Sequence, residues 1–596
     1  MRQIFSSGLC FVLFAFLPAP LLAASADSSL NAGLDPRVGL NLRLGNDPSQ
    51  LPPNMLAQAE PHIARHPTQP DILVATFQEG RYVDGGAVDC GYSVTQDGGL
   101  SWTRALIPGL TMVVGGPYYR ATDPVAGFDL QGNIYLNTLV ALDSAFNTAA
   151  IVISRSTNNG VTFDPPIEVT RSTTSALELD KNWMAINNFS NTATAGRIVV
   201  TYTEFTPTAN PIASSYSTNS GRTWSTPILF TAPNAQCQGS QPVFLPSGKL
   251  AVVYWDFAPL DPTYQYIEVV TSTNGGASYT FSNLVAKVLG YSPPQVRSGD
   301  FLPSACGNST NDSLYVVYQA LYQGQPRVLF TMSTNAGVTW TTPVPASDNV
   351  SNTPVFNPAI SASPDGQTLV ASFYDERMNP GNSNLVDLFL AQSLDGGVSW
   401  QPNLRLTTTS SDVRLAPLTS SGYMLGDYLG IAAPIGTDVP AVPVWVDTRM
   451  GDPDPFITRV GVSSNITFAA WRAARFSEAE IGLPGVGGPG ADPDGDGVVN
   501  ELEYAFGLNP RVKDSPIFSF VYSRANGSFT ANYKRLRFPS DLTYNWLTST
   551  NLQTWTPLLT SGMGLVDSNP QLLDVTDNLG TNAGGKHFYR LGVTLH

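Results

Sequence analysis

The chain has 596 residues and a formal net charge of -15, and only 13% of its residues are charged. The length suits several domains or one large repeat array. The negative charge argues against binding to nucleic acid and against docking on an anionic membrane. The 52 glycines and 47 prolines favour a turn-rich, all-β protein over a helical one.

The N-terminus has the three parts of a secretory signal. Arg2 supplies the positive charge, residues 9–16 supply the apolar core, and residues 24–26 form an A-x-A cleavage site. The apolar stretch is too short to be a membrane anchor. We therefore expect residues 1–26 to be a signal peptide. The mature chain is then secreted or held at the cell surface, with no transmembrane segment.

A short motif, SLDGGVSW at residues 393–400, recurs about every 60 residues. Each copy places a hydroxyl residue before Asp or Asn, then a glycine, and ends on an aromatic residue. The aligned acidic or amide residues are Asp97, Asn158, Asn219, Asn274, Asn335 and Asp395. Each copy predicts a hairpin turn, because glycine tolerates positive φ and the Asp or Asn side chain accepts from nearby backbone amides.

A second repeat marks the first strand of each unit. A polar residue followed by a small or apolar run occurs near residues 60, 122, 180, 241, 301, 357 and 426. A β-branched strand follows each opening, at 72–77, 134–139, 198–202, 250–254, 314–318, 368–373 and 442–446. Strands with turn signals and no helical period fit four-stranded propeller blades. The seven openings, with residues 38–43 as a closing strand, favour seven blades.

The hairpin motif resembles the Asp-box, S-x-D-x-G-x-T-W, of β-propellers that include the sialidases. The resemblance covers roughly residues 55–465. It implies a secreted bacterial, sialidase-like protein in which residues 27–465 form the propeller. It gives six blades as the alternative, because sialidases have six. It also implies that the Asp-boxes lie on outer hairpins, away from the central site.

Three cysteines follow the expected signal peptide. Cys237 and Cys306 lie near the starts of neighbouring repeats, and an exported protein meets oxidising conditions. We expect these two residues to form a disulfide and Cys90 to keep a free thiol. No spacing of the cysteines matches a zinc site.

Residues 466–512 break the strand pattern. Residues 468–480 have helical composition, and a Gly/Pro linker at 482–490 leads to an acidic loop. The loop places oxygen ligands at the spacing that wraps one Ca²⁺, namely Asp492, Asp494, Asp496, the Val498 carbonyl, Asn500 and Glu503. It resembles EF-hand and dockerin-type loops, which implies a calcium-stiffened joint. The alternative is a solvated acidic turn. Strands return over 513–596 and predict a small β-sandwich.

The propeller site is less defined. The sialidase resemblance implies an arginine triad, a Tyr–Glu nucleophile pair and an Asp acid/base. The usual R-I-P arginine is missing, because that place reads Glu60-Pro61-His62-Ile63. Carboxylate recognition relies on bidentate guanidinium contacts, so the departure bears directly on the substrate. We expect His62 and His66 to be structural rather than metal ligands.

We take as catalytic candidates Tyr428, Glu204, Asp375 and Asp447. A polar ring at the channel mouth gives as candidates for substrate binding Arg377, Arg449, Asp123, Asp180, Lys181, Asp300 and Asp427. Asp375–Arg377 and Asp447–Arg449 share a D-x-R pattern, for which an ion pair within the blade is the alternative.

The chain is thus predicted to be a sialidase-like propeller that acts on or binds glycans, and a glycoside hydrolase is one form of that prediction. The alternative is a non-catalytic propeller that binds carbohydrate or protein at the cell surface. Calcium is the only cofactor expected, and no organic cofactor is predicted.

Overall fold

The computed structural model describes residues 4–6, 9–11, 35–172, 174–258, 261, 263–300, 302–349, 352–513, 518–523, 528–536, 539–558, 572–581 and 588–596. The predicted cleavage site at 24–26 lies outside these residues. The all-β class is confirmed, because strands predominate and the longest helix has seven residues. The chain divides into Asn41–Val462, called here the propeller unit, and Met1–Leu40 with Ser463–His596, called the terminal unit.

The propeller unit consists of successive four-stranded antiparallel groups. The first two groups are β4 (Gln58–Arg65), β5 (Leu73–Arg81), β6 (Ala87–Thr95) and β7 (Thr103–Leu106), then β8 (Ala121–Phe128), β9 (Ile134–Ala141), β10 (Ala149–Ser156) and β11 (Ile167–Arg171). The next two are β12 (Glu178–Ile186), β13 (Ile198–Phe205), β14 (Ile212–Ser217) and β15 (Ile228–Leu229), then β16 (Cys237–Phe244), β17 (Leu250–Asp256), β18 (Gln265–Ser272) and β19 (Phe281–Val288).

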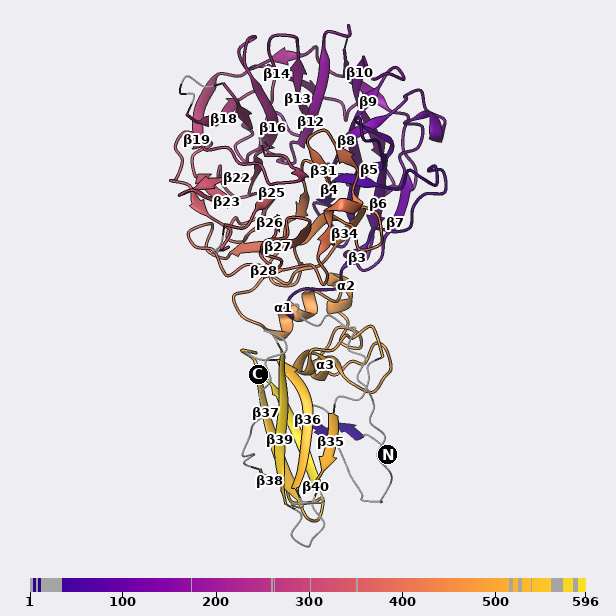
Figure 1. The fold of residues 1–596 in the computed structure, drawn as a ribbon, viewed down its shortest axis with the longest axis vertical. Helices are drawn as coiled ribbons and strands as arrows, with labels where there is room; N and C mark the ends of the chain where they lie inside the picture. The colour runs from indigo at the N-terminus through magenta and orange to yellow at the C-terminus, as the bar shows by residue number, and fades with distance from the viewer. Residues whose placement is uncertain are drawn as a thin grey trace. The chain divides into compact units, whose positions relative to one another are not determined.

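The remaining groups complete the circuit. They are β21 (Ser304–Gly307), β22 (Leu314–Tyr322), β23 (Gln325–Ser333) and β24 (Val344–Pro345), then β25 (Val355–Ala362), β26 (Leu369–Asp375), β27 (Leu385–Ser393) and β28 (Leu404–Arg405), and last β32 (Gly430–Ala432), β33 (Val442–Asp447), β34 (Asp454–Ile457) and β3 (Leu42–Arg43). The first strands of the groups lie towards the middle of the unit and the fourth strands towards its rim (Figure 1).

The two ends of the propeller unit pair with each other. Leu42 and Arg43 of β3 pair antiparallel with Ile457 and Phe456 of β34. Arg43 also forms an ion pair with the buried Asp454. The segment predicted to close the ring therefore supplies its last strand. Seven blades stays our prediction for the ring as a whole.

Hydrophobic clusters fill the space between neighbouring groups. In one of them Val253 and Trp255 of β17 pack with Val316 and Tyr318 of β22, and all four side chains are fully buried. Alternating residues of the strands face opposite sides, so each sheet contributes one apolar face to each neighbour. Burial of these large side chains, at about 25 cal/mol per Å² of apolar area, is the main stabilising contribution.

The repeated motif forms the turn between the third and fourth strands of a group. In the copy after β27, the Asp395 carboxylate accepts from the Ser399 backbone N–H at 2.9 Å and from the Ser393 hydroxyl at 2.8 Å. The Ser393 Oγ in turn accepts from the Gly397 N–H at 2.9 Å. These bonds hold the turn that the motif predicts, and they lie on the outer hairpin.

A small three-stranded sheet joins connections that are far apart in sequence. It contains β20 (Val296–Arg297), β31 (Gly422–Met424) and β30 (Leu418–Thr419). Strands β20 and β31 pair in parallel, which links the connection after the fourth group to the connection after the sixth. Figure 1 draws β31 near the middle of the propeller unit. Two 3₁₀ turns, Met112–Val114 and Val413–Leu415, and strand β29 (Ser411–Asp412) lie in the same kind of connection.

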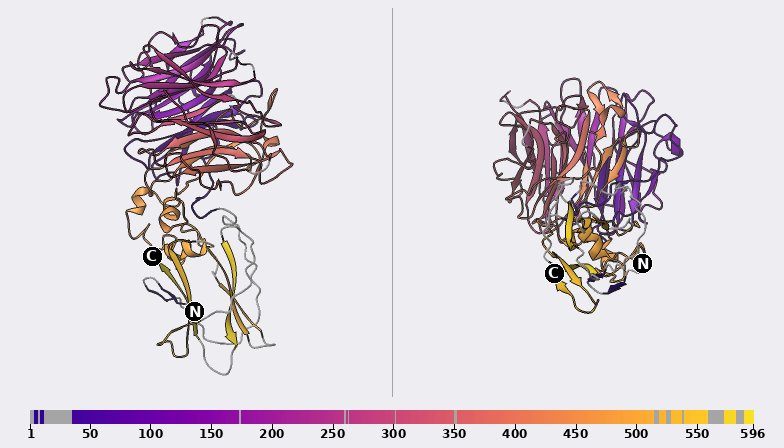
Figure 2. Two further views of the ribbon diagram at one scale, coloured as in Figure 1. Left: turned by 90° about the vertical axis from the view of Figure 1, so that its left-hand side faces the viewer. Right: turned by 60° about the horizontal axis from the view of Figure 1, so that its bottom comes forward.

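The terminal unit has its own core. Its helices are α1 (Phe468–Ala473), α2 (Glu478–Ile481) and α3 (Asn500–Phe506), and its strands are β1 (Ile4–Ser6), β2 (Leu9–Phe11), β35 (Phe518–Tyr522), β36 (Ser528–Leu536), β37 (Leu542–Ser549), β38 (Thr556–Pro557), β39 (Leu572–Thr581) and β40 (Phe588–Leu595). Sheets β35-β36-β39 and β38-β37-β40 form two layers (Figure 2). Trp471 of α1, Tyr504 of α3, Tyr533 and Trp546 share one cluster with both layers.

The predicted disulfide between Cys237 and Cys306 is wrong, because all three cysteines are free thiols in the structure. Cys237 begins β16, whereas the Ala305 N–H donates to the side chain of Gln241, so Cys306 lies beside the far end of that strand. Gln241 lies four residues along β16 from Cys237, which is roughly 13 Å, and a disulfide needs Cα atoms within about 7 Å. The repeat spacing indicates on which strand of a group each cysteine lies, but not at which end of that strand.

Among the described residues, no helix is both long and apolar enough to cross a membrane.

Candidate functional site

A β-bulge interrupts the first strand in most groups of the propeller unit. The register shifts between Ala59 and His62, Thr122 and Val125, Asp180 and Trp183, Gln238 and Gln241, and Phe356 and Ala359. The bulged residues have left-handed backbones, with φ of 55° at Glu60, 50° at Asp123, 50° at Lys181, 71° at Gly239 and 50° at Asn357. Bulges re-aim side chains and recur near functional sites. Residues other than glycine adopt a positive φ only where the surrounding structure compensates for the backbone strain.

Proline follows the bulged residue at three of these positions. Pro61, Pro124 and Pro358 come directly after Glu60, Asp123 and Asn357 in the sequence. Proline has no N–H to donate to a strand ladder, so it is tolerated at a bulge where the ladder is already broken. The proline at each of these positions therefore favours the bulge through the local sequence.

We call the charged residues at these first-strand openings and their partners the axial cluster: Glu60, Asp123, Asp180, Lys181, Asp427 and Arg297. Hydrogen bonds join the first three groups of the propeller unit. Gln78 Nε2 donates to Glu60 Oε2 and to Thr122 Oγ1, both at 2.6 Å. The Asp123 Oδ2 accepts from the Lys181 backbone N–H at 3.0 Å. The bond from Gln78 to Thr122 crosses from the first group to the second, and the bond from Lys181 to Asp123 crosses from the third group to the second, so the three openings lie next to one another.

The cluster is completed from the seventh group and the cross-linking sheet. Arg297 Nε donates to Asp427 Oδ1 at 3.0 Å, and its Nη2 donates to the other carboxylate oxygen at 2.5 Å. Asn357 Nδ2 donates to the Gly426 carbonyl at 2.6 Å, and its Oδ1 accepts from the Gly299 N–H at 2.8 Å. A bidentate guanidinium–carboxylate pair is strong and geometrically specific, so Arg297 fixes β20 against the segment that leads into β32, the seventh group's first strand.

Lys181 carries a buried amine among aromatic rings. Its Nζ lies 3.7 Å from the ring centre of Trp183 and 4.2 Å from that of Tyr428. The residue is 3% exposed, and its Nζ has no hydrogen-bond partner among the described residues. Burial lowers the pKa of Lys181 to about 8, while Asp123 and Glu60 oppose part of that shift. The two rings replace water as the neighbours of the cation.

Burial and mutual repulsion raise the pKa values of two carboxyl groups. Burial, with repulsion from Asp123 and Asp427, holds the pKa of Glu60 well above its usual range. Burial, with repulsion from Asp123, raises the pKa of Asp180 to about 8. Gln238 Nε2 donates to Asp180 Oδ2 at 2.8 Å, and Asp180 is only half-buried. The cluster thus contains a partly accessible carboxyl that holds its proton near neutral pH.

The structure places Tyr428 in the cluster but in an unreactive environment. Its hydroxyl donates to the Pro124 carbonyl at 3.3 Å, and its ring packs edge-on against Trp183 with centroids 5.2 Å apart. Burial, with repulsion from Glu60 and Asp123, holds the pKa of Tyr428 well above its usual range. These surroundings oppose the phenolate that a tyrosine nucleophile needs.

The two D-x-R sequences form ion pairs within their own blades. Arg377 Nη2 lies 2.6 Å from Asp375 Oδ2, and Arg449 Nη2 lies 2.6 Å from Asp447 Oδ2. Both aspartate side chains are fully buried. Arg377 also donates to Asn403, which lies beside the fourth strand of its group. The placement favours the structural alternative for all four residues.

Glu204 is the last residue but one of β13, opposite Leu179, and no described residue of the axial cluster bonds to its side chain. Burial raises the pKa of Glu204. The structure therefore brings together five predicted residues, Asp123, Asp180, Lys181, Asp427 and Tyr428. It does not join Glu204 or the two D-x-R pairs to them.

Three further residues were missed by the sequence reasoning. Glu60 and Asp123 share an acid–proline pair at the same place in the repeat, and that signal could have identified Glu60. Trp183 follows Lys181 by two residues and could have been grouped with it. Arg297 lies in a connection without repeat pattern, 130 residues from its partner Asp427, and no sequence signal points to it.

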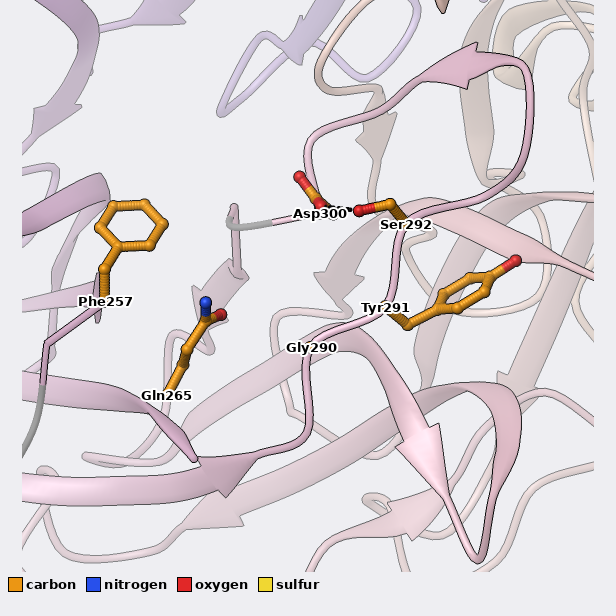
Figure 3. Close-up of a pocket in the computed structure, with 6 residues that line it drawn as sticks. All are labelled: Phe257, Gln265, Gly290, Tyr291, Ser292 and Asp300. Atoms are coloured by element: carbon orange, nitrogen blue, oxygen red, sulfur yellow. Dashed lines mark hydrogen bonds between the residues drawn. The ribbon is translucent and has the colours of Figure 1, made fainter. Parts of the chain in front are cut away.

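A pocket of about 300 Å³ adjoins the cluster (Figure 3). It is lined by Phe257, Gln265, Gly290, Tyr291, Ser292 and Asp300. Asp300 was predicted to bind substrate, and its carboxylate accepts from the Ser292 hydroxyl. Burial raises the pKa of Asp300, and the charge of Asp427 adds to this.

The acidic loop of the terminal unit converges as a cation site would. One carboxylate oxygen each from Asp492, Asp494 and Asp496 lie within 4.8 Å of one another. The Asp494 pKa is raised by burial and by its two acidic neighbours. Asn500 is fully buried, and its Oδ1 accepts no hydrogen bond from the described residues. A carboxylate triad with an unsatisfied amide oxygen nearby fits a hard cation such as Ca²⁺.

No family model matches the chain, and no curated protein matches it. Several solved structures do. The Hadza microbial sialidase Hz136 is 16% identical, with 54% of this chain and 63% of that chain covered and a TM-score of 0.39. A leech intramolecular trans-sialidase is 12% identical, with 57% and 67% covered and a TM-score of 0.40. A Penicillium chrysogenum α-L-arabinanase is 16% identical, with 56% and 93% covered and a TM-score of 0.39. The match thus spans less than two thirds of the Hadza sialidase.

Proposed function

We propose that the propeller unit acts on glycans at the axial cluster, as a glycoside hydrolase that uses carboxyl groups. The observation that carries the proposal is the meeting of Asp123 and Asp180 from neighbouring groups, one of them with a strongly raised pKa. Glycoside hydrolysis needs two carboxyl groups whose environments give them different protonation states. Groups with perturbed pKa values that meet from several elements of a fold are candidates for an active site.

The two carboxyl groups take separate roles. Asp180 is half-buried and its pKa is raised to about 8, so near neutral pH it holds the proton that a general acid gives to the leaving oxygen. Asp123 accepts from the Lys181 N–H and from the Thr122 hydroxyl, at 3.0 and 2.8 Å. These donors hold the Asp123 side chain in position as the second carboxyl group of the pair.

Hydrolysis of a panel of fluorogenic glycosides, sialosides included, tests the proposal. Residues 27–596 are used as wild type, as Asp180→Asn and as Asp438→Asn, since Asp438 is exposed on a loop of the same unit. Loss of the general acid is expected to lower kcat by roughly 100-fold or more, because general acid catalysis contributes about 10²–10⁴-fold. Equal turnover by Asp180→Asn and wild type would remove Asp180 from the reaction.

A binding propeller without catalysis is the second candidate. It is favoured by the burial of the cluster, because Glu60 is 4% and Lys181 3% exposed. No turnover of any glycoside by a folded protein, together with retained binding of an oligosaccharide, would support this candidate against the hydrolase.

We also propose that the loop at Asp492, Asp494 and Asp496 holds one Ca²⁺, with Val498, Asn500 and Glu503 as further ligands. When bound, the ion would neutralise the repulsion between the three carboxylates. Calorimetric titration of the chelator-treated protein with Ca²⁺ is expected to give one site, and Asp494→Asn is expected to weaken it. If Asp494→Asn gave the same heat of titration as the wild type, the loop would be a solvated acidic turn.

We further propose that the chain is exported after removal of residues 1–26. The N-terminal sequence of the protein recovered outside producing cells is the test. It is expected to begin near Asp27, and an intact Met1 on the exported protein would contradict the signal peptide.

A further inference from the structure

The pocket beside the axial cluster is built by the fourth group and by the connection that follows it. Phe257 comes directly after β17, Gln265 begins β18, and residues 290–292 follow β19. Asp300 closes the pocket from the far end of the same connection. In Figure 3 the side chains of Phe257, Gln265 and Asp300 border one open space, whereas the ring of Tyr291 points away from it.

Each polar group of the pocket is held in position. Trp255 Nε1 donates to Gln265 Oε1 at 2.8 Å, which orients the amide. Among the described residues, none accepts a hydrogen bond from the Gln265 Nε2, so this amide can donate to a ligand. Ser292 donates its hydroxyl proton to Asp300, so the remaining lone pairs of that carboxylate are open to a ligand's hydroxyl groups. One amide donor and one carboxylate acceptor beside an aromatic ring match the polar edges and the apolar face of a sugar ring.

Among the described residues, the lining contains one acidic residue and no Lys, Arg or His. The nearest guanidinium in sequence, that of Arg297, is bound bidentately by Asp427. A sugar carboxylate would therefore meet the Asp300 carboxyl without a cation to pair with, which costs desolvation energy. A hydroxyl group would find both a donor and an acceptor. The pocket thus selects an uncharged ring over an acidic one.

The pocket lies near the axial cluster. Gly299, next to Asp300 in the chain, is so close to the segment before β32 that a Cβ there would lie 1.8 Å from the Asp427 carbonyl oxygen. Its N–H is also held by Asn357 at 2.8 Å. The charge of Asp427 reaches the Asp300 carboxyl. The backbone next to Asp300 thus links the pocket to the cluster.

We propose that this pocket is a subsite for one uncharged sugar ring, with Phe257 as its stacking surface and Gln265, Ser292 and Asp300 as its hydrogen-bonding groups. The subsite rests on the proposed function, because it binds the glycan on which the axial cluster acts. Its volume of about 300 Å³ is at the lower end of the range for ligand pockets and suits a single ring. Neutral oligosaccharides are thus the substrate class, and sialosides are excluded from this position.

Calorimetric titration with oligosaccharides tests the subsite without relying on turnover. The probes are neutral arabino-, galacto-, xylo- and manno-oligosaccharides, and lactose against 3'-sialyllactose as a pair that differs by one acidic sugar. The protein is residues 27–596 as wild type, Phe257→Ala, Asp300→Asn and Phe281→Ala. Phe281 is the matched control, because it is a 37% exposed phenylalanine of the same group and does not line the pocket.

At least one neutral series is expected to bind, and Phe257→Ala and Asp300→Asn are each expected to weaken it about tenfold, whereas Phe281→Ala leaves it unchanged. Tighter binding of an acidic sugar, or equal affinity in Phe257→Ala and wild type, would overturn the subsite. If the protein binds an oligosaccharide in a way that depends on Phe257 but cleaves no glycoside, the subsite stands and the hydrolase is rejected. If the protein cleaves a glycoside equally well without Phe257 or Asp300, the hydrolase stands and the subsite is rejected.

Discussion

At the scale of single residues, the axial cluster balances carboxylates against a few cations that are already engaged. Arg297 is bound to Asp427, and Lys181 lies over Trp183 and Tyr428. The guanidinium of the cluster, that of Arg297, is thus already paired with a carboxylate of the protein. Glu60 stands where the R-I-P motif would place an arginine, so at this position the site has a carboxyl group instead of a guanidinium.

His62 is expected to make the propeller unit less stable in mild acid. Burial, with the charge of Lys181, lowers the pKa of His62 to about 3, and its Nδ1 accepts from the Ala126 N–H at 3.2 Å. Below pH 6.5 the unfolded chain gains a proton there that the folded chain rejects, so stability falls as the pH falls from about 6.5 towards 3.

Urea unfolding of the wild type and of His62→Gln at pH 7.5 and 5.5 measures this effect. The wild type should lose roughly 1 kcal/mol more than the variant between these two pH values. Parallel losses in both proteins would show that His62 does not contribute to the slope.

Arg377 is expected to stabilise the fold rather than to bind substrate. Its removal leaves the fully buried Asp375 without its charge partner, which costs roughly 3 kcal/mol. Arg414 is the matched control, because Asp412 and Arg414 form the same D-x-R pair on the surface, where the arginine side chain is 57% exposed. Thermal unfolding should distinguish Arg377→Ala from a nearly unaffected Arg414→Ala. A stable Arg377→Ala that no longer binds or cleaves a glycan would restore the predicted substrate role.

At the scale of elements, the repeated turn after β27 contains two glycines in different surroundings, whereas the copies at Asn158, Asn219 and Asn335 keep only the second glycine. Gly397 has φ of 93°, and a Cβ there would lie 2.6 Å from the Phe330 ring of the preceding group. Gly396 has φ of 71°, and its nearest neighbour would be 3.4 Å away. At Gly397 both the backbone conformation and the packing oppose a side chain, whereas at Gly396 only the backbone conformation does.

Gly397→Ala is therefore expected to cost more than Gly396→Ala. Backbone strain costs about 1–2 kcal/mol at either position, and the clash with Phe330 adds about 1–3 kcal/mol at Gly397. Denaturant unfolding of the two variants gives the comparison. If Gly396→Ala proved equally destabilising, the ring of Phe330 would not be what excludes a side chain.

Elements also show how far the sequence alone could reach. The strands and hairpins were predictable, because Asp395 and its counterparts recur with a fixed period and each makes its bonds within a few residues. The sheet of β20, β30 and β31 was not, because its strands have two or three residues and pair across connections more than 100 residues apart. The D-x-R pairs were recognised as a pattern, but only the packing around Asp375 and Asp447 distinguishes an ion pair from a binding group.

At the scale of the whole molecule, the chain contains two units with separate cores. The clusters between blades lie within Asn41–Val462, whereas the cluster around Trp471 and Trp546 belongs to the terminal unit. Separate cores allow separate cooperative transitions. The acidic loop at Asp492 lies in the terminal unit, so a cation bound there would act on the stability of that unit.

Scanning calorimetry is expected to show two transitions, of which Ca²⁺ raises only one. Binding to the folded state alone stabilises it by about 2.7 kcal/mol at 100 times the dissociation constant. Asp494→Asn should abolish the shift and leave the other transition in place. A shift of both transitions, or of neither, would contradict a calcium site that belongs to the terminal unit.

The central claim, that Asp180 is the general acid of a glycan-cleaving site, is tested most directly by the pH dependence of kcat/KM. With the neutral glycoside that the wild type cleaves best, activity should fall as the pH rises through about 8, because Asp180 then loses the proton it must donate. Asp180→Asn should turn over at least 100-fold more slowly and lack that descending limb. An unchanged limb in Asp180→Asn, or turnover close to that of the wild type, would contradict the account.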